Sequence, residues 1–156
     1  MRNIITGLLL TLMSTVGWGA GNDQYGNSVM QLVAKTNETA DTTYLSISLK
    51  RCAAMLNLVN GILLRDTGSA PFPEATESLL VVAMSLDTRK AQERGATQET
   101  KDGIPARVSE EYARHRNKYL EWMTFNYDQH GDYWGTDLVM GEELDSYKAL
   151  LNAVSE

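Results

Sequence analysis

The stretch "LSISLKRCAAMLNLVNGILL", Leu45 to Leu64, carries the most regular apolar pattern of the chain. Its apolar side chains recur at alternating steps of four and three residues, which places them on one side of an α-helix. The first residues of the stretch alternate apolar and polar side chains as a strand does, but the helical spacing continues without a break. We therefore expect one helix from about Asp41 to Leu64, packed against other helices through a stripe of Leu45, Leu49, Cys52, Leu56, Val59 and Leu63.

Three further segments have helical patterns. One begins near Pro73 and ends near Gly95, the next runs from about Pro105 to Tyr127, and the last runs roughly from Glu142 to Val154. The polar residues from Thr97 to Ala106 are expected to form a loop, because they contain an Asp-Gly turn signal. The sequence therefore predicts an all-α fold, a small helical bundle of three to four helices that forms a single domain over residues 41–156.

The N-terminus has the order of regions that is typical of a secretory signal peptide. A positive charge at Arg2 precedes an uncharged apolar run from Ile4 to Val16, and small residues follow. The run is shorter than the roughly 20 apolar residues that span a bilayer. We expect a cleaved signal peptide over residues 1–20, a periplasmic or secreted location, and no stable membrane insertion after cleavage. Residues 21–40 are polar and are expected to be a flexible segment, with a short helix possible at the apolar residues 29–33.

The charge of the chain argues against two classes of partner. It carries 20 acidic and 14 basic residues, a formal net charge of −6 at pH 7. An acidic protein repels nucleic acid and anionic lipid on average. We therefore expect no nucleic-acid partner.

Cys52 is the single cysteine of the chain. It lies in the middle of the apolar stripe, where a free cysteine behaves as a small hydrophobic residue. On a helix the neighbouring Lys50 and Arg51 point well away from it, so neither is expected to activate the thiol. We expect a buried structural side chain. An intermolecular disulfide is the main alternative, because a cysteine without a partner in the same exported chain often pairs with a cysteine of another chain.

An aromatic face surrounds one of the two histidines. His115 shares a helix face with Tyr112, Tyr119 and Trp122. Such a setting is found around haem or metal ligands and also around core histidines that are hydrogen-bonded to tyrosine, and the second case is the more common. These four residues are therefore candidate ligand-binding residues, although no cofactor is expected.

The segment "DQHGDYWG", Asp128 to Gly135, offers two weaker candidates. Asp128, His130 and Asp132 bring an imidazole and two carboxylates together as a candidate metal site. They lack the full calcium-loop pattern, so a solvated turn is the preferred interpretation. Tyr133 and Trp134 lie between glycines and are candidate partner-binding residues. The preferred alternative is that they fold back over one end of the bundle.

Catalytic motifs are missing from the sequence. It contains no G-x-S-x-G, H-E-x-x-H or phosphate-binding glycine loop. The acid pairs Glu110-Glu111 and Glu142-Glu143 fall in the first turns of expected helices, where carboxylates stabilise the helix dipole. These features favour an exported, soluble, non-enzymatic accessory or interaction protein that binds a protein partner. The alternatives are a helical-bundle carrier of haem or another small hydrophobic ligand, and a hydrolase or metal-dependent enzyme that uses the carboxylates around His130.

Overall fold

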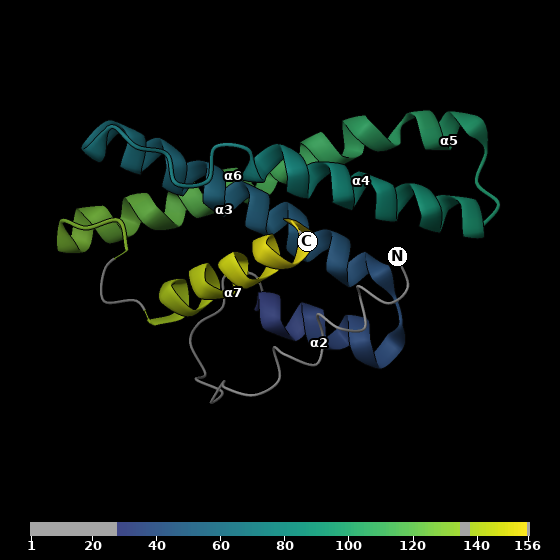
Figure 1. Cartoon of the computed structure of the whole chain (residues 1–156), viewed down its shortest axis with the longest axis horizontal. Helices are drawn as coiled ribbons and strands as arrows, with labels where there is room; N and C mark the ends of the chain where they lie inside the picture. Colours follow the sequence, from purple (N-terminus) through teal and green to yellow (C-terminus); the bar gives the residue numbers. More distant parts are fainter. Residues whose placement is uncertain (1–27, 135–137, 156) are drawn as a thin grey trace.

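The computed structural model describes residues 28–134 and 138–155, and the expected signal peptide lies outside these ranges. Within them the chain is all-helical and contains no strand, which confirms the predicted fold class. The helices number more than the three to four that were expected. They are α2 (Val29–Thr39), α3 (Thr42–Thr67), α4 (Ala75–Glu93), the short α5 (Gln98–Asp102), α6 (Ile104–His130) and α7 (Leu138–Ser155), as Figure 1 shows.

Helix α3 is the centre of the structure. It runs through the middle of the molecule (Figure 1) and contacts α2, α4, α6 and α7. Every residue from Ser48 to Leu56 is buried, so this part of the helix is covered on all sides rather than along a single stripe. Among the described helices, α3 alone is long and apolar enough to cross a membrane, with 61% of that window buried. Burial on all sides is the property of a core helix.

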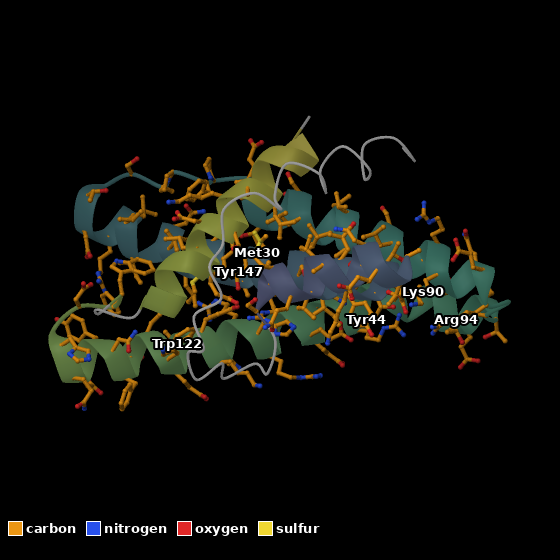
Figure 2. The ribbon with its side chains drawn as sticks, turned by 90° about the horizontal axis from the view of Figure 1, so that it is seen from below. Met30, Tyr44, Lys90, Arg94, Trp122 and Tyr147 are labelled. Atoms are coloured by element: carbon orange, nitrogen blue, oxygen red, sulfur yellow. The ribbon has the colours of Figure 1, made fainter. Side chains whose placement is uncertain are left out.

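Both ends of α3 are fixed by local hydrogen bonds. The Asp41 side chain accepts a hydrogen bond from the Thr43 amide at 2.9 Å, as an N-cap does. At the other end Gly68 adopts a left-handed conformation, φ +71°, and its amide donates to the Leu64 carbonyl at 3.0 Å. Lys90 of α4 lies at the same end of the molecule as Tyr44 (Figure 2) and forms an ion pair with Asp41. The predicted start of this helix is confirmed, and its end lies three residues beyond Leu64.

Residues 21–40 were expected to be flexible, but the described part of this segment forms helix α2. Helix α2 begins with a capping box, in which the Gln31 amide donates to Ser28 Oγ at 3.2 Å and the Ser28 amide donates to Gln31 Oε1 at 2.9 Å. Val29 and Val33 are buried in the main core, and Leu32 is buried as well. These residues therefore form a packed helix, because the capping box and the core contacts together stabilise it.

Two other boundaries differ from expectation. The loop predicted at residues 97–106 contains α5, whose N-cap is Thr97, and leads directly into α6 at Ile104. Helix α6 also continues to His130, so the segment 128–130 is helical rather than part of a loop. Gly131, with φ +71°, ends that helix through a hydrogen bond from its amide to the Tyr127 carbonyl at 2.8 Å.

Candidate functional site

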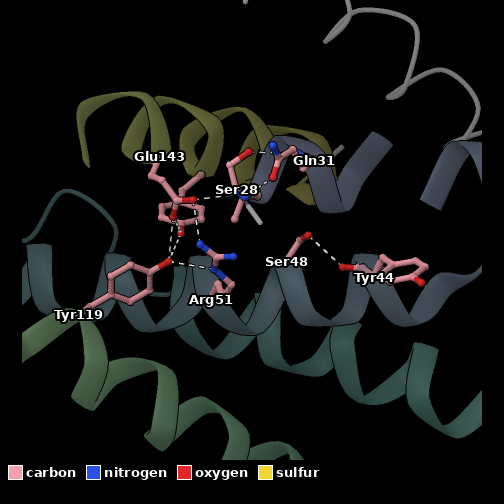
Figure 3. Close-up of polar contacts among 9 residues, drawn as sticks. Ser28, Gln31, Tyr44, Ser48, Arg51, Tyr119 and Glu143 are labelled. Carbon is pink, nitrogen blue, oxygen red and sulfur yellow. Dashed lines mark hydrogen bonds and ion pairs between the residues drawn. The ribbon is translucent and has the colours of Figure 1, made fainter. Parts of the chain in front are cut away.

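Four buried polar side chains from three helices form one hydrogen-bonded group, which we call the Arg51 cluster: Arg51 of α3, Tyr119 of α6, and Glu143 and Tyr147 of α7 (Figure 3). The Arg51 guanidinium donates to Glu143 Oε1 at 2.8 Å through Nη2 and to the Tyr119 hydroxyl at 3.1 Å through Nε. Tyr119 donates to Glu143 Oε2 at 2.9 Å, and the Tyr147 hydroxyl is hydrogen-bonded to both Glu143 and Tyr119. The cluster therefore joins the central helix to α6 and α7.

Glu143 extends this connection to a fourth helix. Its Oε1 atom also accepts a hydrogen bond from the Val29 amide, at 3.1 Å, at the first residue of α2. A carboxylate at a helix N-terminus satisfies an amide that has no partner within the helix and stabilises the helix dipole. Glu143 was expected to lie in the first turn of its own helix. Because α7 begins at Leu138, Glu143 lies beyond that turn and caps α2 instead.

The protonation states in the Arg51 cluster follow from burial and from the neighbouring groups. Burial alone would lower the pKa of Arg51, but Tyr119, Tyr147 and Glu143 outweigh it and hold that pKa above the ordinary value. Burial raises the pKa of Tyr147 well above 10, and Tyr119 and Glu143 add to the effect. The guanidinium is therefore charged and Tyr147 is a neutral donor at pH 7.

Exposure decides what the Arg51 cluster can do. Its four side chains are between 0% and 4% exposed, so the cluster is sealed from solvent. Every bond described above is between atoms of the protein itself. This arrangement holds helices together and has no access for a substrate, which makes it a structural centre rather than an active site.

Lys50, the residue before Arg51, forms a second buried ionic group on another side of α3. Its ammonium forms an ion pair with Asp87 of α4 at 3.2 Å and another with Glu111 of α6. The Lys50 side chain is 3% exposed, whereas Asp87 and Glu111 are 13% and 28% exposed. This group therefore joins α3, α4 and α6 close to the protein surface.

The candidate ligand-binding residues divide between core and half-buried positions. Tyr119 and Trp122 are buried and stack with ring centroids 6.4 Å apart, and Tyr119 belongs to the Arg51 cluster. Tyr112 and His115 are half-buried. Burial raises the pKa of the Tyr112 hydroxyl, with Arg116 opposing the rise.

His115 lies on α6 between Glu111 and Tyr119, one turn from each. Burial, followed by the positive charges of Arg51, Lys50, Lys118 and Arg114, lowers the pKa of its imidazole to about 4. The imidazole is therefore neutral at pH 7. A group of positive charges around it opposes both its protonation and the binding of a metal cation.

Cys52 is a free cysteine and its side chain is buried, which confirms its predicted place in the core. Its thiol donates to the Tyr147 carbonyl at 3.4 Å, next to the Arg51 cluster. Burial raises the pKa of the Cys52 thiol, and Glu143 adds to the rise. The thiol is therefore protonated and weakly reactive in the folded chain.

The metal candidates do not form a cluster in the described part of the chain. Asp128 and His130 are exposed in the last turn of α6, and Asp132 follows in the turn. Asp132 Oδ1 accepts a hydrogen bond from the Trp134 amide at 3.2 Å, which gives this carboxylate a role in the turn. Within residues 28–134 and 138–155, no three side chains of His, Cys, Asp or Glu are placed to hold a metal ion.

Tyr133 and Trp134 are half-buried and pack against the hydrophobic core. Tyr133 also takes part in a surface stack at the end of α6. Its ring stacks on Tyr127 with the centroids 4.6 Å apart, and the Arg65 guanidinium lies over the Tyr133 ring, 5.4 Å from its centroid. Arg65 Nη1 also donates to the Tyr133 hydroxyl at 3.2 Å. We call Arg65, Tyr127 and Tyr133 the aromatic end.

Sequence reasoning missed the importance of three charged residues, Lys50, Arg51 and Glu143. The available signal was the position of Lys50 and Arg51 inside an otherwise apolar helix, since buried charges are paired. Their partners, up to 92 residues away, carry no local pattern that identifies them. No family model, no curated protein and no solved structure matches this chain.

Proposed function

We propose that this chain is an exported helical protein that acts by binding a protein partner through its aromatic end. The support for export is the order of charge, apolar run and small residues at the N-terminus. The support for binding is the Arg65, Tyr127 and Tyr133 stack, which is the single observation that carries the proposal.

The composition of the stack favours a role in recognition. Arginine and tyrosine are enriched at interface positions that contribute most to binding energy. Arg65 is 59% exposed and Tyr127 is 47% exposed, so both are accessible to a partner. The ring stack and the hydrogen bond from Arg65 hold these side chains in place before binding, which reduces the conformational entropy that binding costs.

The alternatives gain less support from the described residues. The enzyme alternative uses the carboxylates around His130, but within residues 28–134 and 138–155 no three side chains of His, Cys, Asp or Glu are placed to hold a metal ion. A carrier needs a cavity beside its ligand residues, whereas Tyr119 and Trp122 fill part of the core. A surface groove formed by α3, α4 and α6 is lined by other residues.

A photo-crosslinking experiment tests the proposal. The crosslinking residue benzoylphenylalanine replaces Tyr127 in one variant and Phe125 in a control variant. Phe125 is 61% exposed on the same helix, about half a turn round from Tyr127, so the two positions match in chemistry and accessibility. We expect one discrete crosslinked protein at position 127 in the native host and none at position 125. Equal labelling at both positions, or none at either, would contradict the proposal.

A further inference from the structure

An open groove lies beside the aromatic end. It has a volume of about 570 Å³ and is formed by the second half of α3, the connection to α4, the start of α4 and one residue of α6. The residues that matter for its chemistry are Asn57, Asn60, Gly61, Arg65, Thr76 and Arg116. Arg65 belongs both to the groove and to the aromatic end, so the two surfaces are continuous.

The charge of the groove is opposite to that of the chain. Its lining includes two arginines and no aspartate or glutamate, whereas the whole chain has a formal net charge of −6. The other polar groups in the lining are the side-chain amides of Asn57 and Asn60, which can donate hydrogen bonds to an anion, whereas the Thr76 hydroxyl already donates to the Ala53 carbonyl at 3.4 Å. An anionic group is therefore the ligand that this lining complements best.

Arg116 is held in an orientation that leaves its terminal nitrogens available. Its Nε donates to Asn57 Oδ1 at 3.0 Å, which fixes the plane of the guanidinium. Among the described residues, the two terminal nitrogens of Arg116 make no hydrogen bond and no ion pair. By contrast, Arg65 pairs with Asp66 and with Tyr133. A guanidinium with free terminal N–H groups binds a carboxylate through two parallel hydrogen bonds.

The walls of the groove are fixed before any ligand binds. The Asn60 side chain accepts a hydrogen bond from the Phe72 amide at 2.9 Å and donates one to the Phe72 carbonyl, which ties the connection between helices to α3. Gly61 is exposed, and a Cβ atom added there would meet nothing within 4 Å. The absence of a side chain at Gly61 keeps this part of the groove open.

We propose that the groove binds a side-chain carboxylate of an acidic segment of a partner protein, with Arg116 as the main anchor and Asn57 and Asn60 beside it. This inference rests on the proposed function, since it assigns a chemical character to the partner that the aromatic end contacts. The stack would contact the apolar part of the partner, and the adjacent groove would bind the partner's carboxylate.

The test is a titration of the ¹⁵N-labelled chain, followed by NMR, with a short glutamate-rich peptide whose C-terminus is amidated. The control ligand is the same peptide with glutamine in place of glutamate. We expect shifts centred on the side-chain amides of Asn57 and Asn60 and on Arg116 Nε, and none with the glutamine peptide. An absence of shifts, or similar shifts from both peptides, would overturn the proposal.

Three variants make the titration specific. Arg116→Gln removes the anchor and should weaken binding about tenfold or more, because a charge-assisted pair is lost. Gly61→Leu fills the groove without changing its charge and improves helix propensity, so it should fold and block binding. Arg114→Gln removes an exposed charge from the same helix outside the groove and should leave the affinity unchanged. Equal weakening in the Arg114 and Arg116 variants would show non-specific attraction and would contradict the assignment.

Two further arms separate the remaining explanations. If inorganic phosphate binds as tightly as the glutamate peptide, the groove is a general anion site and the inference fails. Crosslinking at position 127 in the Gly61→Leu chain separates this inference from the proposed function. Crosslinking that persists at wild-type yield there would refute the groove as part of the contact and leave the aromatic end supported. If the crosslink at position 127 is lost in the Gly61→Leu chain and kept in the wild-type chain, both the groove and the aromatic end are supported as parts of the contact.

Discussion

Lys50 and Arg51 are consecutive residues of α3, and their charged groups are buried on different sides of the helix and paired with different helices. Lys50 pairs with Asp87 of α4 and Glu111 of α6, whereas Arg51 pairs with Glu143 of α7. Two adjacent cations thus fix three helices around the central one. Because a buried charge is costly unless it is paired, this arrangement favours one packing of the helices over others that would leave an ion unpaired.

Removing one partner of the Arg51 cluster should destabilise the fold severely. Glu143→Leu leaves the Arg51 guanidinium buried without its carboxylate and removes the acceptor of the Val29 amide. We expect the free energy of unfolding, measured by urea denaturation, to fall by about 3–5 kcal/mol. The double variant Arg51→Met with Glu143→Leu should recover part of this loss, because no unpaired charge remains. A loss below about 1 kcal/mol in the single variant would show that the pair is not buried as described.

Breaking the buried ion pairs of Lys50 should cost much more stability than breaking an exposed ion pair. Lys50→Met removes a cation whose side chain is 3% exposed and leaves two carboxylates facing each other, whereas Arg89→Ala breaks a pair with Glu93 whose members are 49% and 66% exposed. We expect Lys50→Met to lower the urea midpoint clearly and Arg89→Ala to change the free energy of unfolding by no more than about 0.5 kcal/mol. Similar effects from the two substitutions would contradict the burial of Lys50.

The folded chain should lose stability in mild acid partly because of His115. Burial and the neighbouring positive charges lower the pKa of this imidazole to about 4 from an ordinary value of 6.5, so the folded state disfavours its protonation. The unfolded chain therefore binds the proton first, and the contribution of His115 to stability is present above pH 6.5 and is lost as the pH falls towards 4. Urea midpoints across this range should fall less steeply for His115→Gln than for the wild type, while the carboxylates titrate alike in both. Parallel curves would refute the prediction.

Cys52 should be unreactive until the chain unfolds. The thiol is fully buried, and burial raises its pKa. We expect a thiol-specific colorimetric reagent to modify it no faster than the chain unfolds, and we expect Cys52→Ala to cost about 1 kcal/mol by leaving a small cavity. A dimer on a non-reducing gel that disappears with reductant would instead support the intermolecular disulfide.

Helix α2 should contribute to the stability of the whole domain. Ser28→Ala removes the side chain that caps α2 and breaks the capping box with Gln31. We expect a loss of about 1 kcal/mol in the free energy of unfolding, with a single cooperative transition. If stability is unchanged, the segment does not fold with the rest of the domain and the flexible-arm interpretation would regain support.

The sequence predicted the features that depend on local spacing. The all-α class, the start of α3 near Asp41 and the core position of Cys52 follow from helical periodicity, which neighbouring residues determine. Of the four residues that were expected to share a face of α6, Tyr119 and Trp122 are buried, and Tyr112 and His115 are half-buried.

The missed features depend on residues far apart in the chain. An apolar stripe on α3 predicts one buried side, but Ser46, Ser48, Lys50 and Arg51 are buried too, because neighbouring helices cover the remaining sides. Glu143 shows the same limit. Glu143 was expected to stabilise the N-terminus of its own helix, but its carboxylate accepts a hydrogen bond at the N-terminus of α2, 114 residues earlier. Sequence patterns near Glu143 cannot identify the N-terminus of α2 as its partner, because only the folded chain brings the two together.

The aromatic end is the central functional claim, and crosslinking in the native host tests it most directly. The quantity to measure is the yield of crosslinked partner at position 127 relative to position 125, first in the wild-type background and then with Tyr133→Ala. We predict a discrete partner at position 127 alone, with a yield that falls when the stack is broken. Comparable yields at both positions, or a yield at position 127 that Tyr133→Ala leaves unchanged, would contradict the claim.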